Sequence, residues 1–197
     1  MILKHTRIAL ILLLVFTLLT GGIYPVLVTG MAHLLFPMQS GGSLIVRNGR
    51  VLGSALIGQP FTSPSYFWSR PSATVPFPYN GAASGGSNLA PSNPALRIRV
   101  QHDIVHLREA DTRLNALIPV DLVTSSASGL DPHISPDAAS MQIPRVSRAR
   151  GLTENQLSAL VMHHTEGRFL GIFGEPRVNV LMLNLDLDDL TRAKGRH

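Results

Sequence analysis

The side chains whose types and spacing could do chemistry gather in the stretch 124–151. Ser126 and Ser128 precede Asp131 and His133 by only a few residues. A serine, a histidine and an aspartate are the components of a nucleophilic triad. Neither serine, however, lies in the Gly-x-Ser-x-Gly pattern that exposes the nucleophile of α/β-hydrolases. We therefore favour a cap, turn or interface role for these residues over catalysis.

Further acid, base or metal-ligand candidates lie toward the C-terminus. They are His163, His164, Glu166 and Glu175. Because adjacent residues point to different sides of a helix, the two histidines do not form the His-x-x-x-His pair of a helical zinc site. The sequence predicts no metal site and no catalytic residue.

A second polar stretch, 72–93, is rich in Ser, Gly, Pro and Asn. Its segment Ser84-Gly85-Gly86-Ser87 suggests a phosphate-binding loop. The Walker pattern ends in Gly-Lys-[Ser/Thr], and there is no lysine between Lys4 and Lys194, so a Walker site is excluded. Long loops of this kind are often functional, and we expect this one to become ordered against a partner.

Local signals around 124–151 predict how the candidate residues are positioned. Asp131-Pro132 predicts a turn, and Ser135-Pro136 predicts a helix start with serine as the N-cap. We expect Asp131 to act as a further cap, since a carboxylate there can accept backbone N–H bonds. The helix runs to Gly151, and Pro144 inside it predicts a kink or break.

Two more helices are predicted from their start signals. Asn93-Pro94 begins one that extends to about Asn115. Thr153 begins the other and forms a capping box with Gln156.

The sequence also predicts two strand regions and contains one cluster of aromatic residues. Residues 43–57 predict a hairpin, because Asn48-Gly49 favours a type I′ turn. Residues 177–187 predict a central strand with apolar side chains on both faces, followed by a frayed polar tail. The aromatic segment 61–77 holds the only tryptophan, Trp68. It is an interface anchor, part of a membrane-interface belt, or a loop packed on the core.

The N-terminal segment 8–31 carries no charged side chain, which predicts a transmembrane helix. A cleaved signal peptide is disfavoured because the apolar run continues past Gly22 without an Ala-x-Ala site. Gly21, Gly22 and Gly30 would let another helix approach closely. Lys4 and Arg7 precede the span and favour a cytoplasmic N-terminus with the bulk of the chain outside.

Composition narrows the class of protein. The chain has 197 residues, no cysteine and a formal net charge of +5. Its mean hydropathy of +0.20 is high for a soluble domain. Without cysteine, disulfides and thiolate-bound metals are excluded. The arginines are scattered and no nucleic-acid motif is present, so acidic lipid or an acidic partner fits the charge better than nucleic acid.

Long motifs in one order resemble a known family. They are YFWSRPSA, YNGAASGGSNLAPSNPAL, SGLDPHISP, RVSRARGL and TEGRFLGIFGEPRVNVLMLNL. Over about 8–188 the chain is similar to the C subunit of the Kdp potassium-transporting P-type ATPase. The resemblance implies a single-span, non-catalytic partner of a potassium-binding channel-like subunit and an ATP-hydrolysing subunit. It also implies a catalytic chaperone that raises the ATP affinity of the hydrolysing subunit.

The resemblance implies that ATP and potassium are handled by the complex, and we expect no cofactor to be bound directly by this chain. Nucleotide or partner-interface candidates are Ser84, Gly85, Gly86, Ser87, Asn88, Ser126, Ser128, Gly129, Asp131, His133, Gln142 and Arg145. The predicted orientation places these residues away from cytoplasmic ATP. Direct nucleotide contact and contact with a partner therefore both stay open.

The sequence as a whole predicts an α+β protein with one transmembrane helix and a small antiparallel sheet. The expected boundaries are a cytoplasmic N-terminus at 1–7, a membrane helix at 8–31, an extracytoplasmic domain at 32–188 and a polar tail at 189–197. The expected location is the inner membrane. The alternatives are a membrane-anchored extracytoplasmic hydrolase and a stand-alone binding module.

Overall fold

The computed structural model describes residues 2–113 and 117–194. The helix predicted to extend from Asn93 to about Asn115 is shorter than expected, because it ends at Ala110 and Asp111 is its C-cap. Asn115 itself and tail residues 195–197 lie outside the described residues. The chain forms two compact units, which meet in sequence between Leu52 and Gly53.

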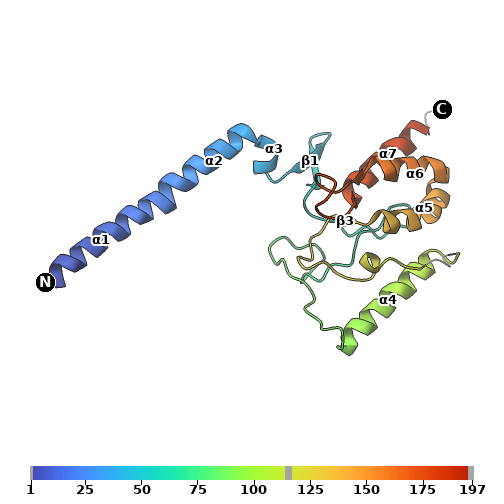
Figure 1. Cartoon of the computed structure of the whole chain (residues 1–197). Helices are drawn as coiled ribbons and strands as arrows, with labels where there is room; N and C mark the ends of the chain where they lie inside the picture. Colours follow the sequence, from blue (N-terminus) through green and yellow to red (C-terminus); the bar gives the residue numbers. More distant parts are fainter. Residues whose placement is uncertain (1, 114–116, 195–197) are drawn as a thin grey trace. The chain divides into compact units, whose positions relative to one another are not determined.

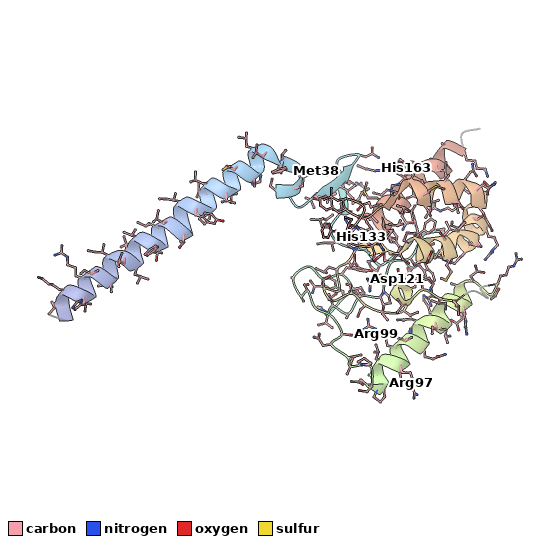
Figure 2. All side chains as sticks on the ribbon, viewed as in Figure 1. Met38, Arg97, Arg99, Asp121, His133 and His163 are labelled. Atoms are coloured by element: carbon pink, nitrogen blue, oxygen red, sulfur yellow. The ribbon has the colours of Figure 1, made fainter. Side chains whose placement is uncertain are left out.

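The first unit contains one long apolar helix (Figure 1). It is made of α1 (Ile2–Leu18), a π-helical turn η1 (Leu19–Ile23) and α2 (Tyr24–Leu35). The helix spans Leu3–Leu35, and its most apolar stretch of 18 residues has a mean hydropathy of 2.3 with none of that stretch buried within the chain. Side chains ring this helix on all sides (Figure 2). The prediction of a single membrane-length apolar helix is confirmed, and the helix is longer than the 8–31 segment.

The π-helical turn has a local cause. Pro25 lies in the first turn of α2 and has no N–H to donate to the preceding turn. The N–H of Tyr24 bonds to the carbonyl of Leu19, five residues back. This wider turn contains Gly21 and Gly22, and π-bulges of this kind often lie at functional positions.

A short helix and a hairpin follow. Helix α3 (Pro37–Ser40) leads into β1 (Leu44–Arg47) and β2 (Arg50–Ser54), which pair in a two-stranded sheet. Asn48 and Gly49 have φ values of 50° and 73°. Positive φ at both central residues defines the type I′ turn, so the predicted hairpin is confirmed.

The second unit combines helices with a three-stranded antiparallel sheet, which confirms the α+β class. Its helices are α4 (Pro94–Ala110), η2 (Val120–Leu122), α5 (Pro136–Arg150), α6 (Glu154–His163) and α7 (Val180–Lys194). Its strands are β3 (His133–Ile134), β4 (Thr165–Glu166) and β5 (Arg177–Asn179), in the order β3-β5-β4. Val178 on the central strand lies opposite both Ile134 and Thr165.

The core lies where α5, α6 and α7 pack together (Figure 1). Val146, Leu157, Leu183 and Leu187 are fully buried there, one or two from each helix. Phe67 is also fully buried and Trp68 nearly so. The core alternative for the aromatic cluster is therefore correct.

The predicted helix caps are confirmed. Asn93 and Ser135 accept backbone N–H bonds as N-caps, and Thr153 forms a complete capping box with Gln156. Gly151 ends α5 in the left-handed conformation, with φ of 63°. The start signals were reliable because each depends only on residues within one turn of the chain.

A kink or a break was predicted at Pro144, and the break is wrong, because α5 continues through Pro144 to Arg150. Its neighbours Ile143 and Val146 are buried in the core. Apolar burial on both sides of the proline holds the helix together despite the missing backbone donor.

The predicted strand 177–187 is also wrong beyond Asn179, where α7 begins. Val180, Leu183 and Leu187 are buried at helical spacing, but the run is so apolar that it also satisfies a strand pattern. The side chain of Asn179 accepts the N–H of Met182, as an N-cap does. The fraying expected after Asp188 is wrong up to Lys194, since α7 includes these residues.

Candidate functional site

The predicted site residues of the second unit fall into three groups. They are two serine–glycine loops, an Asp–His turn beside a cleft, and two buried side chains of α5. The predicted helix-packing glycines lie on the apolar helix of the first unit.

The two serine–glycine loops lie against each other, although more than forty residues separate them. Gly85 N donates to Ser128 O over 2.8 Å, and Ser84 Oγ donates to the same carbonyl over 3.1 Å. A Cβ on Gly129, whose φ is +67°, would lie 2.6 Å from Gly85 O. A Cβ on Gly86 would lie 3.0 Å from Ala127 O. The glycines thus permit close backbone approach between the loops.

Three backbone N–H groups of the two loops are hydrogen-bonded within the fold. Ser126 Oγ accepts the N–H of Gly129 over 3.0 Å, and Ser128 Oγ accepts the N–H of Leu130 over 3.1 Å. Phosphate-binding loops depend on backbone N–H groups that point at the ligand. Here the N–H groups of Gly85, Gly129 and Leu130 are bonded within the fold. Ser87 and Asn88 continue the first loop, with Asn88 exposed at a φ of 51°.

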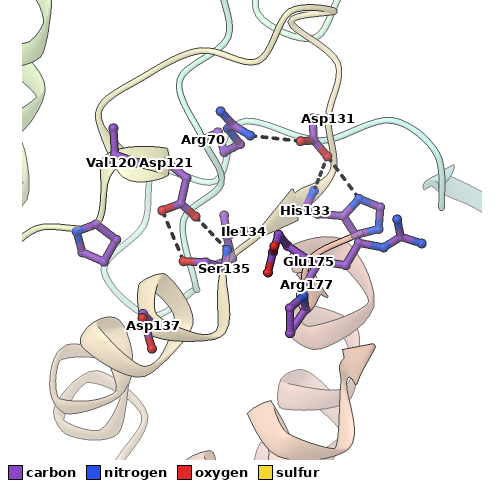
Figure 3. A pocket seen from close by; sticks show the side chains of 12 residues that line it. Arg70, Val120, Asp121, Asp131, His133, Ile134, Ser135, Asp137, Glu175 and Arg177 are labelled. Carbon is purple, nitrogen blue, oxygen red and sulfur yellow. Dashed lines mark hydrogen bonds and ion pairs between the residues drawn. The ribbon is translucent and has the colours of Figure 1, made fainter. Parts of the chain in front are cut away.

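A surface cleft of about 610 Å³ lies beside the Asp–His turn. Figure 3 shows its lining, which comes from the loop before α4, the η2 segment, β3 and the start of α5, and the residues leading into β5. The lining residues are Arg70, Pro119, Val120, Asp121, Asp131, His133, Ile134, Ser135, Asp137, Glu175, Pro176 and Arg177.

The carboxylate of Asp131 binds both His133 and Arg70 in this cleft (Figure 3). Its Oδ1 accepts the backbone N–H of His133 over 3.0 Å and lies 3.1 Å from His133 Nδ1. Its Oδ2 accepts from Arg70 Nη1 over 3.2 Å. Burial raises the pKa of Asp131, but the hydrogen bonds from His133 and the charge of Arg70 outweigh burial and hold that pKa below its ordinary value. Asp131 is therefore an ionised turn residue.

The expected helix-capping role of Asp131 is wrong. Ser135 caps α5, and its N–H and Oγ donate to Asp121 over 2.7 and 3.2 Å. Asp121 and Arg70 were missed by the sequence analysis. The residue spacing gave no sign of them, because they lie 14 and 61 residues from their partners.

The cleft carries side chains of both charges. The carboxylates of Asp121 and Asp131 are hydrogen-bonded within the chain. Arg70 and Arg177 face it together with four acidic residues. Within residues 2–113 and 117–194, no group of three or more His, Asp or Glu is placed to hold a metal ion. His133 Nδ1 bonds to Asp131, whereas the hydroxyls of Ser126 and Ser128 accept backbone N–H groups. The geometry does not assemble these residues into a triad.

Gln142 forms half of a buried clamp on the aromatic segment. Its side-chain amide accepts the N–H of Trp68 over 2.7 Å and donates to the carbonyl of Trp68 over 3.1 Å. Asn184 on α7 does the same for Phe67, with both bonds at 2.9 Å. We call Gln142 and Asn184 the amide clamp. A lone Asn among the leucines of 181–187 was the sequence feature that could have revealed Asn184.

Arg145 extends the clamp. It donates to the carbonyls of Pro64 and Tyr66 over 2.6 and 3.0 Å, and its guanidinium lies 4.3 Å from the centroid of the Trp68 ring. Burial lowers the pKa of Arg145 to about 10. Gln142 and Arg145 are thus buried structural residues that fix the segment 64–68 on the helices.

Comparison with known proteins places the chain in a family. Residues 6–189 match the family model described as K+-transporting ATPase, c chain. The chain is 59% identical over 186 residues to the potassium-transporting ATPase KdpC subunit of Sorangium cellulosum, covering 94% of this chain and 98% of the relative. It is 60% identical over 184 residues to the KdpC subunit of Polaromonas naphthalenivorans, covering 93% and 94%. The chain belongs to the KdpC family of potassium-transporting ATPase subunits.

Proposed function

We propose that the chain is the non-catalytic accessory subunit of a high-affinity, ATP-driven potassium importer in the inner membrane. In this proposal it assembles with a potassium-binding channel-like subunit and an ATP-hydrolysing P-type subunit. The observation that carries the proposal is the family match over residues 6–189. Co-purification tests it: a tag on this chain should recover both other subunits together with potassium-stimulated ATPase activity. Recovery of the chain alone, or of an activity that needs no other subunit, would overturn it.

We further propose that the N-terminus is cytoplasmic and the second unit extracytoplasmic. Support comes from Lys4 and Arg7, which precede an apolar helix in the way that the positive-inside rule expects. A reporter enzyme that is active only outside the cytoplasm, fused after His197, should be active. A reporter active only in the cytoplasm serves as the matched fusion, and its activity would reverse the orientation.

The proposed role is that of a catalytic chaperone that raises the ATP affinity of the hydrolysing subunit. Such an effect needs no ATP site on this chain. If the chain binds the ATP-loaded pump more tightly than the empty pump, it must raise ATP affinity by the same factor. The internal bonds of Gly85, Gly129 and Leu130 favour this indirect route, with the loops and the cleft acting as partner contacts.

Reciprocity gives a sharp test of this role. The dissociation constant of a non-hydrolysable ATP analogue is measured for the complex with and without this chain. The dissociation constant of the chain for the remaining subunits is then measured with and without the analogue. We expect both ratios to exceed one and to agree, since the linkage is reciprocal. An analogue affinity that is unchanged when the chain is removed would contradict the chaperone role.

We propose that Gly21, Gly22 and Gly30 form the contact of the apolar helix with a partner helix. Within the described chain, a Cβ on any of the three would meet nothing within 4 Å, so a larger residue fits this chain by itself. Leu at positions 21 and 22 should therefore loosen the chain from the complex by blocking close helix approach. The double substitution Val15→Leu with Val28→Leu is the matched control. If the purified complex contains the Gly→Leu variant at full occupancy, the glycines do not form the contact with a partner helix and serve only the local geometry of this helix.

A further inference from the structure

The connection between β4 and β5 carries a cluster of exposed apolar side chains. Phe169, Leu170, Ile172 and Phe173 are 71%, 74%, 72% and 62% exposed. We call these four residues the apolar tip. Single exposed apolar residues are common, but four large ones within five positions of a folded segment are typical of an interaction site.

The apolar tip has a defined fold. Phe169 and Phe173 form an antiparallel bridge, with hydrogen bonds of 2.8 and 2.9 Å between their backbones. Leu170 and Gly171, with φ of 53° and 74°, make the turn between them. Gly171 N donates to Arg168 O and Ile172 N to Phe169 O. Because the backbone is already fixed, little backbone conformational entropy remains to be lost when the tip binds.

Paired charges flank the apolar tip on both sides in the sequence. Arg168 and Glu175 form an ion pair of 2.7 Å, and Arg177 pairs with Glu166 on the neighbouring strand at 2.9 Å. An apolar centre inside a polar rim is the anatomy of a protein–protein interface. A loop that binds anionic lipid combines apolar side chains with unpaired Lys or Arg, and interfacial Trp or Tyr often accompany them. Residues 167–176 contain neither Trp nor Tyr, and their arginine is paired.

We propose that the apolar tip is a docking element that inserts into an apolar, concave surface of another subunit of the same ATPase. This inference rests on the proposed function, which places the chain in a complex. Phe169 and Phe173 are the expected anchors, because aromatic side chains buried at the centre of an interface carry most of its binding energy. The ion pairs remain at the rim.

Thiol labelling tests the proposal directly. The chain has no cysteine, so Ile172→Cys supplies its only thiol. Met162→Cys on α6 is the matched control, because Met162 is also 72% exposed. Each variant is labelled with a water-soluble maleimide as isolated chain in detergent, as chain alone in liposomes, and within the purified complex.

We expect the thiol at position 172 to react slower by about tenfold or more only in the complex, as a side chain withdrawn from water in a packed interface does. The control thiol at position 162 should react equally in all three states. Protection of position 172 in liposomes without the other subunits would assign the tip to lipid and overturn the proposal. Unchanged reactivity in the complex would overturn it as well. In either case recovery of the complex itself would leave the proposed function standing.

A second variant measures what the tip contributes. Phe169→Ser with Phe173→Ser should weaken binding of the chain to the other subunits on the order of tenfold to a hundredfold. The thermal unfolding midpoint of the isolated chain should not change, because both rings are mostly exposed there. Unaltered binding by this folded variant would contradict the docking role.

Discussion

The amide clamp and the Asp131 turn use the same kind of bond, a polar side chain that binds backbone, but they differ in burial. Gln142 and Asn184 are 2% and 1% exposed, and they satisfy backbone groups of the buried residues Phe67 and Trp68. The side chain of Asp131 is 29% exposed and lines an open cleft. Water can replace a lost partner only in the cleft. The clamp should therefore decide stability, and the cleft should be free to serve contact with partners.

The largest expected effect comes from breaking the clamp. Gln142→Leu and Asn184→Leu each leave a buried N–H and a buried carbonyl without a partner. Each should lower the free energy of unfolding by about 2–6 kcal/mol, at 1–3 kcal/mol per orphaned group. Urea unfolding of the full chain in detergent measures this loss through the only tryptophan, Trp68, whose backbone the clamp binds. Ser158→Ala on the exposed face of α6 is the control. A loss below about 1 kcal/mol would show that the clamp is dispensable.

A smaller effect is expected at the helix start beside the cleft. Ser135→Ala removes the cap on Ala138 N and the hydroxyl bond to Asp121. The expected loss is about 1–2 kcal/mol, as for other serine caps. Ser135→Asp keeps a capping oxygen but places it against the Asp121 carboxylate, so it should recover less than Ser135→Asn. Equal stability of the Asp and Asn variants would show that the Asp121 carboxylate does not repel a negative charge at position 135.

Asp131 should matter less for stability than either of these sites. Asp131→Ala removes the partly exposed ion pair with Arg70 and the hydrogen bond from the His133 N–H. Together these are worth about 1 kcal/mol. Asp131→Asn retains an acceptor for the His133 N–H and should keep most of the potassium-stimulated ATPase activity of the complex. If Asp131→Asn assembles normally but abolishes that activity, the turn belongs to the mechanism of transport.

The pH dependence of the stability difference between wild type and Asp131→Asn should be the smallest effect. The pKa of Asp131 lies below its ordinary value of 3.8, so ionisation favours the folded state. Its contribution is fully present above pH 3.8 and is lost as the pH falls through the lowered pKa of the folded chain. The stability difference between wild type and Asp131→Asn should therefore be constant near neutral pH and shrink in acid. A difference that grows in acid would reverse the sign of the pKa shift.

The sequence alone determined the helix starts, one helix end and the hairpin turn, which depend on neighbours within a turn or two of the chain. Ser135, Thr153 with Gln156, and Gly151 marked helix ends through local hydrogen bonds. Asn48-Gly49 fixed a hairpin turn because its two residues tolerate positive φ. An uncharged N-terminal run was sufficient to predict the apolar helix. The family resemblance also followed from sequence, since long ordered motifs are specific.

Only the tertiary structure decided which distant residues meet. Gln142 and Asn184 clamp a segment that lies 74 and 117 residues away, and Gly85 meets Ser128 across more than forty. The tertiary structure also decided that 180–187 is a helix, because burial against α6 and in the core chose between two periodicities that one apolar run allowed. Local patterns record conformational preference. Contacts at long range are set by how the whole chain buries its apolar surface and satisfies the buried backbone, and no short stretch contains that information.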